Sequence, residues 1–444
     1  MSVPRLVVRA LRLVAVAMAA TLASVDPSLA LNISTKNSRN DGTVGHQKGL
    51  KDYDNIKRFG AERVRDRDRT PFQPDGMRLG NFIFYPSLAG QTIYDDNFDA
   101  VPEGKEGELR YEVEPRLEIR SDLPRHILDF IAGGRFVAFQ DHSDQNYAEG
   151  YSDVIWRVDI NHAHALYGAL HASREFEEQG TAEAPLGASE AVPVTNLNAD
   201  IGLKRDAGRL AAQLDFSAQS FDFDDIKALN GDILDQDYRD NRIFRGDFTL
   251  NYRFSPGYEF VVSTGFEKID NRGDEFIDRD SQSYAVGAGL QFEFNPLIRG
   301  SLMGAYAHRD YRLSELRDFS SWLYEAELQW LPTELLTVYA TAGQNIAETG
   351  YEDASARKDT KFGLSVEYEI WRNMVATAGA TASWQDYLGT DRLDNVYVGN
   401  IGIEYYFNKN ILFNLSYEYQ VRDSGLDEFD YTRNLFRFGV KLRN

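Results

Sequence analysis

Residues Tyr431 to Asn444 read YTRNLFRFGVKLRN and decide the fold. Apolar and polar side chains alternate there, with Phe436, Phe438, Val440 and Leu442 against Arg437, Gly439 and Lys441. A period of two predicts a β-strand with one apolar and one polar face. Because the sequence stops inside this strand, both strand edges need partners, and pairing it with the first strand supplies the second one. The stretch therefore predicts an all-β fold, a closed antiparallel barrel with lipid outside and water inside.

The same strand resembles the insertion signal of bacterial outer-membrane barrels. Arg437, Gly439 and Leu442 match that pattern, whereas Asn444 stands where such signals end in an aromatic residue. The resemblance implies the barrel-assembly machinery as a partner, with outer-membrane lipid and lipopolysaccharide around the barrel.

A second alternating segment shows why the polar face must meet water. Its charged face carries Arg110, Glu112, Glu114, Arg116, Glu118 and Arg120, and its other face is apolar. Six charges on one face cannot be buried in the core of a β-sandwich. The segment therefore predicts a membrane strand whose polar face lines an aqueous lumen.

Similar segments repeat over residues 77–444 in an up-and-down order. Short connections such as 255–257 alternate with long ones such as 222–240. Eight short and nine long connections join about 18 strands, with 16 as the alternative if the division of one segment is wrong. Since outer-membrane barrels place short turns in the periplasm, an even count predicts both chain ends there.

We predict that the charged face lines a pore. The predicted pore-lining residues are Arg110, Glu112, Glu114, Arg116, Glu118, Arg120, Arg135, Arg157, Arg245, Asp247, Arg253, Glu293, Glu325, Glu327, Glu367, Glu369, Glu404, Glu418, Arg437 and Lys441. Most arginines come from the first and last strands and most glutamates from the later ones, so a basic and an acidic wall would face each other. Such a lumen predicts weak cation preference.

The composition and the N-terminus restrict the class of protein. The chain has 444 residues, no cysteine and a net charge of −21, so disulfides and thiolate metal sites are excluded. Beyond residue 30, no apolar run is long enough for a transmembrane helix. Arg5, Arg9 and Arg12, an apolar core over 13–23 and the small residues at 28–30 predict a signal peptide over 1–30. An N-terminal anchor helix is the alternative, but the apolar core is short for a span.

Residues 31–76 form a polar stretch without periodicity. They carry ten Lys/Arg against seven Asp/Glu, on a chain that is acidic as a whole. A segment so poor in apolar side chains predicts a disordered periplasmic region. The alternative is a plug that folds back onto the acidic barrel.

Residues that could carry chemistry are few. No phosphate-binding, dinucleotide or H-E-x-x-H motif is present, so we expect neither an enzyme nor a cofactor, and no nucleic-acid partner. His162 and His164 could share a metal, although an exposed turn pair is the simpler interpretation. His171 follows on the next strand. A Ser-His-Asp/Asn hydrolase on the barrel stays open as an alternative, without a recognisable nucleophile motif.

Carboxylates are dense in two predicted loops. The first holds Asp95, Asp96 and Asp99, and residues 222–240 hold Asp222, Asp224, Asp225, Asp232, Asp235, Asp237 and Asp240. They could bind divalent cations that bridge lipopolysaccharide phosphates, although solvated loop charge is the simpler interpretation.

The segment Gly76 to Asp99 resembles the opening strand of a family of outer-membrane β-barrel porins, of the beta-barrel porin 2 type. The matching residues are Arg78, Leu79, Gly80, Phe82, Pro86, Leu88, Tyr94, Asp95, Asp96 and Asn97. The resemblance extends over residues 77–444 and implies an outer-membrane barrel, often in bacteria that make exopolysaccharide. We expect a porin for small hydrophilic solutes. The alternatives are an exopolysaccharide export or assembly component with a periplasmic partner, and a plugged structural or adhesive barrel.

Overall fold

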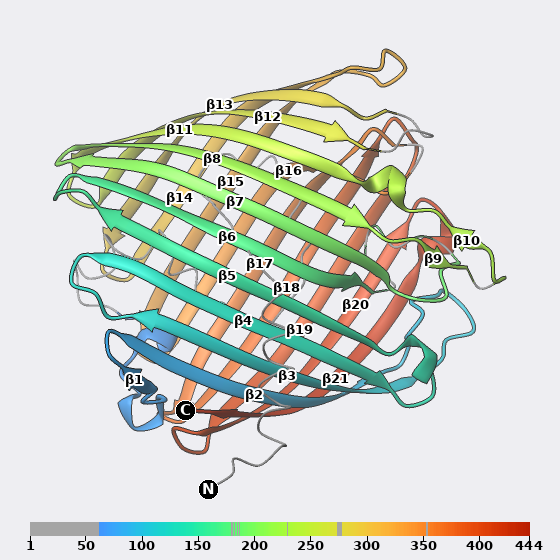
Figure 1. The fold of residues 1–444 in the computed structure, drawn as a ribbon, viewed down its shortest axis with the longest axis horizontal. Coiled ribbons are helices and arrows are strands. Elements are labelled where there is room, and N and C mark those ends of the chain that lie inside the picture. The colour runs from blue at the N-terminus through green and yellow to red at the C-terminus, as the bar shows by residue number, and fades with distance from the viewer. Residues whose placement is uncertain are drawn as a thin grey trace, which may run out of the picture.

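The computed structural model describes residues 62–178, 181, 183, 185, 187–228, 230–272, 278–351 and 354–444 (Figure 1). The predicted signal peptide and residues 31–61 lie outside the described residues.

Eighteen antiparallel strands form a closed barrel, as the alternation predicts. They are β2 (Phe82–Asp95), β3 (Glu108–Ser121), β4 (His126–Phe139), β5 (Tyr147–Asp159), β6 (His164–Glu177), β7 (Val192–Ala207), β8 (Leu210–Phe223), β11 (Asn241–Ser255), β12 (Tyr258–Asn271), β13 (Ser281–Asn295), β14 (Ile298–Tyr311), β15 (Phe319–Thr333), β16 (Leu336–Ala347), β17 (Ala356–Trp371), β18 (Met374–Leu388), β19 (Leu393–Tyr406), β20 (Ile411–Ser424) and β21 (Tyr431–Arg443). Consecutive strands pair throughout, so the alternative of 16 strands is wrong.

The barrel closes where the sequence predicts, between the last strand and the first. β21 pairs antiparallel with β2 over Ser87–Asp95. The start of β2 extends beyond the end of β21, and the short strand β1 (Met77–Leu79) pairs with Phe82–Phe84 there. Gly80 allows the tight turn between β1 and β2 because its φ of 60° is costly for other residues. β1 and β21 thus share one edge of β2.

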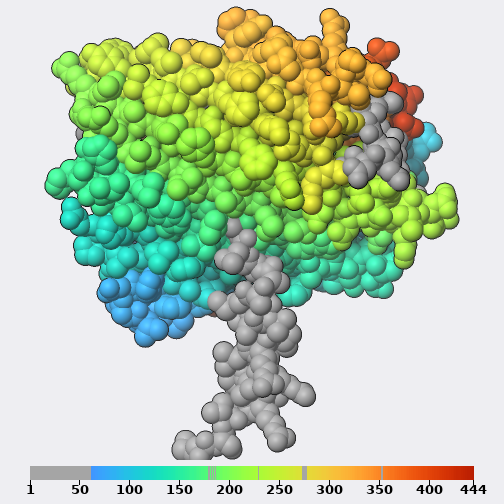
Figure 2. Space-filling view, turned by 45° about the horizontal axis from the view of Figure 1, so that its top comes forward, coloured from blue at the N-terminus to red at the C-terminus, as the bar shows by residue number. Residues whose placement is uncertain are grey.

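Short and long connections lie at opposite ends of the barrel (Figure 1). We call these ends the short-turn end and the long-loop end. The long loops hold η3 (Ser143–Gln145), β9 (Ile226–Lys227), β10 (Ile233–Leu234), η4 (Asp237–Arg239) and η5 (Asp427–Phe429). Residues 62–76 contain η1 (Val64–Asp66) and η2 (Thr70–Phe72) and form, in blue, part of the rim at the short-turn end (Figures 1 and 2). No helix in the described ranges is long and apolar enough to cross a membrane.

The two faces of the wall differ as alternation requires. Tyr111 and Val113 are each 45% exposed, whereas the neighbouring Arg110 and Glu112 are 6% and 2% exposed. Apolar side chains cover the outside, where a barrel meets lipid. The charged residues lie on the opposite face, toward the barrel interior.

Candidate functional site

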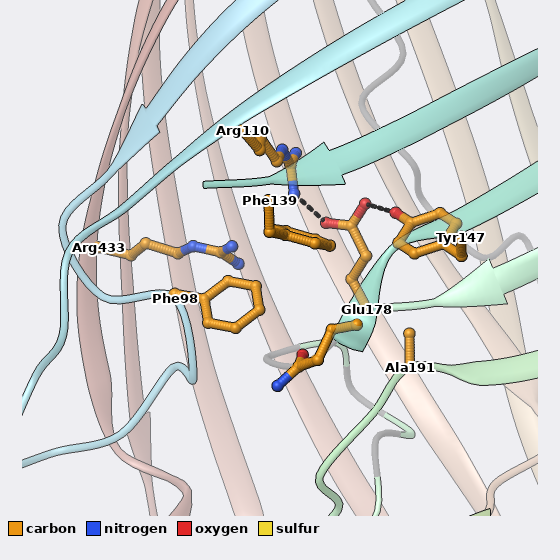
Figure 3. A pocket seen from close by; sticks show the side chains of 8 residues that line it. Phe98, Arg110, Phe139, Tyr147, Glu178, Ala191 and Arg433 are labelled. Carbon is orange, nitrogen blue, oxygen red and sulfur yellow. Dashed lines mark hydrogen bonds and ion pairs between the residues drawn. The ribbon is translucent and has the colours of Figure 1, made fainter. Parts of the chain in front are cut away.

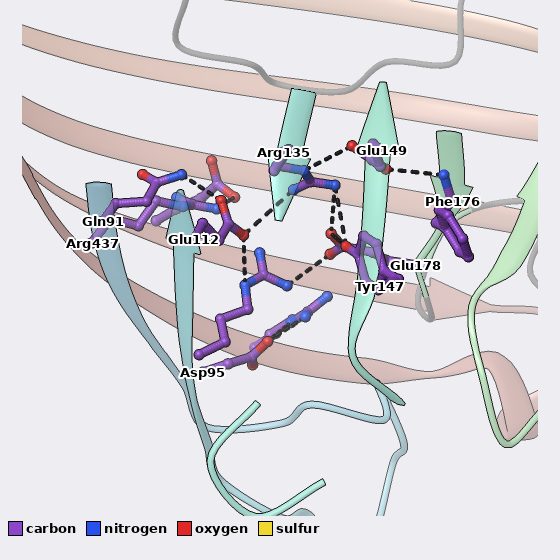
Figure 4. A network of polar contacts seen from close by, with 12 residues as sticks. Gln91, Asp95, Glu112, Arg135, Tyr147, Glu149, Phe176, Glu178 and Arg437 are labelled. Atoms are coloured by element: carbon purple, nitrogen blue, oxygen red, sulfur yellow. Dashed lines mark hydrogen bonds and ion pairs between the residues drawn. The ribbon is translucent and has the colours of Figure 1, made fainter. Parts of the chain in front are cut away.

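A network of charged side chains joins three strands at the long-loop end (Figure 4). Arg135 on β4 contacts Glu149 at 2.8 Å and Glu112 at 3.4 Å. Arg110 on β3 contacts Glu112 at 3.1 Å and Glu178 at 2.9 Å. Glu178 lies in the loop after β6, so charges that the sequence places on one face do meet and hold a loop there.

The described residues of this loop, 178, 181, 183, 185 and 187–191, reach across the inside of the barrel. Beyond Glu178 it reaches β17, where Glu183 forms an ion pair with Arg357. Arg422 on β20 donates a hydrogen bond of 3.2 Å to the carbonyl oxygen of Thr181. Since β17 lies half-way round the ring of strands from β6, these contacts place Arg110, Arg357 and Arg422 on the inner face. We call these described residues the crossing loop.

Residues 349 and 350 of a second loop meet the crossing loop in the interior. The amide of Gly350 and the hydroxyl of Thr349 donate hydrogen bonds to the Glu183 carboxylate. From a third loop, the Tyr238 hydroxyl donates to the Gly350 carbonyl oxygen at 2.7 Å. Arg279 donates to the Thr349 carbonyl oxygen at 2.6 Å. Chain that occupies the interior reduces the cross-section open to solutes at this end.

A small space lies beside the network. Phe98, Phe139 and Tyr147 surround it with Arg110 and Arg433, whose side chains point toward it (Figure 3). Its volume is about 20 Å³, about that of one water molecule. The space is therefore too small for an organic solute, and the charges around it serve to hold the loops.

A second charged cluster lies at the short-turn end. Arg65 contacts Glu404 at 2.8 Å and Glu367 at 2.7 Å, and Arg69 contacts Glu369 at 2.5 Å. These carboxylates belong to the predicted acidic wall. The arginines belong to the predicted basic stretch 31–76, of which only residues 62–76 are described.

The other predicted pore-lining residues are mostly paired with neighbours. Arg437 contacts Glu418 at 3.3 Å, although the sequence assigns them to opposed walls. The remaining ion pairs that involve predicted residues are Arg116–Glu118, Arg120–Glu118, Arg157–Asp159, Arg245–Glu267 and Arg253–Glu259. Glu114 accepts a hydrogen bond from Gln91. Glu293 and Glu327 form no ion pair within the described ranges. Asp247, Glu325 and Lys441 belong neither to the charged network at the long-loop end nor to the charged cluster at the short-turn end.

Sequence reasoning missed four buried arginines on the later strands. They are Arg309, Arg357, Arg392 and Arg422, each at most 6% exposed. They lie at or near strand ends, beside stretches that turn signals assign to loops, such as 345–358. The far wall, expected to be acidic without a strong basic counterweight, therefore carries buried arginines at the long-loop end. If the alternation of each of these strands is extended toward the loop, the arginine falls on the inward face. This position was the signal that the sequence offered.

The family motif closes the barrel seam. Arg433 on β21 donates to Asp95 from Nε at 2.7 Å, and Asn434 donates its amide to Asp96 at 2.6 Å. The fully buried Asn97 donates to the carbonyl oxygens of Val101 and Thr432. The motif residues Tyr94 and Pro86 lie on β2, and Arg78 forms an exposed ion pair with Asp122. Asp95 and Asp96 are therefore occupied by protein partners rather than available to a cation.

The insertion-signal residues lie on β21 as ordinary wall residues. Leu442 is 49% exposed on the outer face. Gly439 faces Asn414 on β20, and a Cβ there would lie 2.3 Å from Asn414 Oδ1. Any larger residue at this position would force the Asn414 side chain to shift.

Two groups of residues are candidates for metal binding, the acidic loop 222–240 and the pair His162 and His164. Asp225, Asp235 and Asp237 are exposed and bring one oxygen each within 4.8 Å of one another. His164 contacts Asn161, and neither it nor His162 belongs to that group.

A Ser-His-Asp arrangement spans β5 and β6. His171 Nε2 lies 2.8 Å from Ser173 Oγ, and its Nδ1 lies 3.1 Å from Asp153 Oδ1. The order of contacts is that of a hydrolase triad. Ser173 is only 2% exposed, however, so a substrate carbonyl does not reach its oxygen in this conformation.

The family model described as "Putative beta-barrel porin 2" matches residues 70–444. The chain belongs to this family. Membership indicates a porin-like barrel in the outer membrane, surrounded by its lipids. No curated protein matches the chain.

Several solved outer-membrane proteins are similar to it. OpdK of Pseudomonas aeruginosa is 11% identical, with 81% of this chain and 99% of that chain covered and a TM-score of 0.44. OccAB2 of Acinetobacter baumannii is 13% identical, with coverage of 81% and 98% and a TM-score of 0.45. A BenF-like porin of Pseudomonas fluorescens Pf-5 is 8% identical, with coverage of 82% and 100% and a TM-score of 0.49. These likenesses carry no argument about solute or mechanism.

Proposed function

We propose that the protein is a porin that lets small hydrophilic solutes diffuse through a polar, charged lumen. The observation that carries this proposal is the crossing loop. Its ion pairs with Arg110 on β3 and Arg357 on β17, two well-separated strands, require those charged side chains to face inward. Charges on the inner face of a barrel are stable when water solvates them or when they pair.

The crossing loop also supports the size class of the solute. It reaches across the interior with residues 349 and 350 held against it. A barrel of 18 strands is wide enough for an aqueous channel, and a loop inside it leaves narrower passages. We therefore infer passage of monosaccharide-sized or amino-acid-sized solutes rather than of polymers.

The orientation follows the rule for bacterial barrels. The short turns lie in the periplasm, so residues 62–76 and the C-terminus lie there too, and the long loops face the outside. The exopolysaccharide alternative has no supporting contact among the described residues.

Reconstituted protein tests the proposal. In proteoliposomes, swelling in arabinose should be faster than swelling in stachyose, and planar bilayers should show discrete conductance steps. Protein unfolded by heat before reconstitution is the control. Swelling at the rate of protein-free liposomes, together with no conductance steps, would contradict a porin.

A further inference from the structure

Residues 62–72 lie against the inner wall at the short-turn end and are here called the strap. Val64 is fully buried, and its amide donates a hydrogen bond of 2.9 Å to Thr337 Oγ1 on β16. Arg443 on β21 donates to the carbonyl oxygen of Phe72 at 2.6 Å. The strap is thus tied to the wall at both of its ends.

Arginines alternate along the strap and each meets carboxylates. Arg65 donates two hydrogen bonds to Glu404, at 2.8 and 3.0 Å, and a third to Glu367 at 2.7 Å. Forked contacts of this kind are among the strongest that a guanidinium makes. Arg67 and Arg69 both contact Glu369, at 3.3 and 2.5 Å.

Without the strap these carboxylates would be nearly unpaired. Within the described ranges, the ion pairs of Glu367 and Glu404 come from Arg65 alone, and Glu369 is otherwise contacted by Arg372 at 3.5 Å. Glu367 is 8% exposed, and its second carboxylate oxygen is buried without a hydrogen-bond partner. The wall therefore offers more hydrogen-bond acceptors than the strap uses. Removing the cation that pairs with buried carboxylates is costly.

We propose that the strap is an autoinhibitory occupant of a cation-binding site formed by Glu367, Glu369 and Glu404. The site takes guanidinium- or amine-bearing solutes, such as short basic peptides or polyamines, and its own arginines mimic them. A cation that binds the three carboxylates displaces the strap and occupies the site in its place. This inference rests on the proposed porin function, whose regulation and solute class it names.

Conductance of the full chain measures the strap's effect. The variant R65Q/R67Q/R69Q should conduct more than the unmodified protein and show stronger cation preference in a salt gradient. Spermidine added at the short-turn side should block it at about tenfold lower concentration, because the carboxylates are then vacant. The control R78Q removes an ion pair at the same end in which both side chains are more than half exposed, and should behave like the unmodified protein. Equal conductance and equal spermidine block in all three proteins would overturn the inference.

A cross-link separates this inference from the porin proposal. The chain has no cysteine, so V64C/T337C places a disulfide only where the strap amide meets Thr337. Spermidine, or the added substitutions E367Q/E404Q, should lower the yield of the cross-link several-fold. That decrease would support the strap site even if no variant conducts, because the absence of conductance would refute only the proposed porin function. A yield unchanged by spermidine and by E367Q/E404Q would refute the strap site even in a conducting protein.

Discussion

Glu183 of the crossing loop forms an ion pair with Arg357 on β17, on the far side of the barrel from β6. Both side chains are nearly buried, at 8% and 7% exposure. A loop that only covered the rim would not reach that strand. The pair therefore acts as a latch that keeps the crossing loop inside the barrel.

Breaking this latch should open the long-loop end. Glu183→Ala leaves Arg357 paired with Asp359, so no buried charge is left without a partner, but it removes the far anchor of the loop. We expect larger conductance steps and faster swelling in stachyose. Glu190→Ala lies in the same loop, where the Glu190 carboxylate accepts a hydrogen bond from the Lys227 amide and has no ion pair within the described ranges, and it serves as the control. Unchanged step size in Glu183→Ala would show that the loop stays in place without the latch.

The barrel itself could be predicted from the sequence, whereas the loops inside it could not. Alternation in segments such as 110–120 is a local property, and it gives strand, face and count without long-range information. Glu178 and Glu183 lie in a stretch without periodicity, and their partners are on β3, β4 and β17. The acidic residues of 222–240 were noticeable by density, yet density does not show which of them meet. Contacts between distant segments depend on where loops turn, and no pattern in one segment encodes that.

The barrel seam should depend on Asn97. Its side-chain amide donates to the carbonyl oxygens of Val101 and Thr432, at 2.8 and 2.9 Å, in a fully buried position. Asn97→Ala leaves these carbonyls without that donor, which costs about 1–3 kcal/mol. The folded band in unheated SDS gels should therefore be lost at a lower temperature. Glu103→Gln, exposed in the same loop, should leave that temperature unchanged. Equal temperatures for both variants would show that the seam does not need this clasp.

The contact between the first long loop, which holds Phe98, and the loop that holds His142 should weaken as pH rises. His142 Nδ1 lies 2.7 Å from Glu108, and the ring stacks on Phe98. The hydrogen bond to Glu108 raises the pKa of the imidazole above its usual value, with further help from Asp99 and Glu106. Because the pKa of His142 is raised in the docked state, protonated His142 stabilises docking fully below about pH 6.5. This stabilisation is lost as pH rises through the pKa of His142 in the docked state.

Hydrogen exchange measures this docking. Amides of residues 96–106 and 140–146 should exchange faster at pH 8 than at pH 6, after correction for the intrinsic rate. His142→Ala should remove the difference, and His162→Ala, in an exposed short turn, should keep it. A difference that persists in His142→Ala would assign the pH effect to another group.

Surface accessibility tests the orientation. A protease site inserted in residues 222–240 should be cut on intact cells because this long loop faces outward. A site inserted at 372–373, the short turn between β17 and β18, should be cut only after the outer membrane is made permeable. Cleavage of the second site but not the first on intact cells would reverse the proposed topology and place the strap outside.

His171 should act as a structural brace rather than as a general base. It connects Ser173 and Asp153 on adjacent strands, and Ser173 is covered. His171→Ala removes the imidazole that contacts the partly buried Asp153 and should destabilise the barrel by about 1–3 kcal/mol, while Ser173→Ala should cost about 1 kcal/mol or less. A fluorophosphonate probe should leave the folded protein unlabelled, since its phosphorus must approach Ser173 Oγ as a substrate carbonyl would. Labelling that disappears in both Ser173→Ala and His171→Ala would instead establish an activated serine and revive the hydrolase alternative.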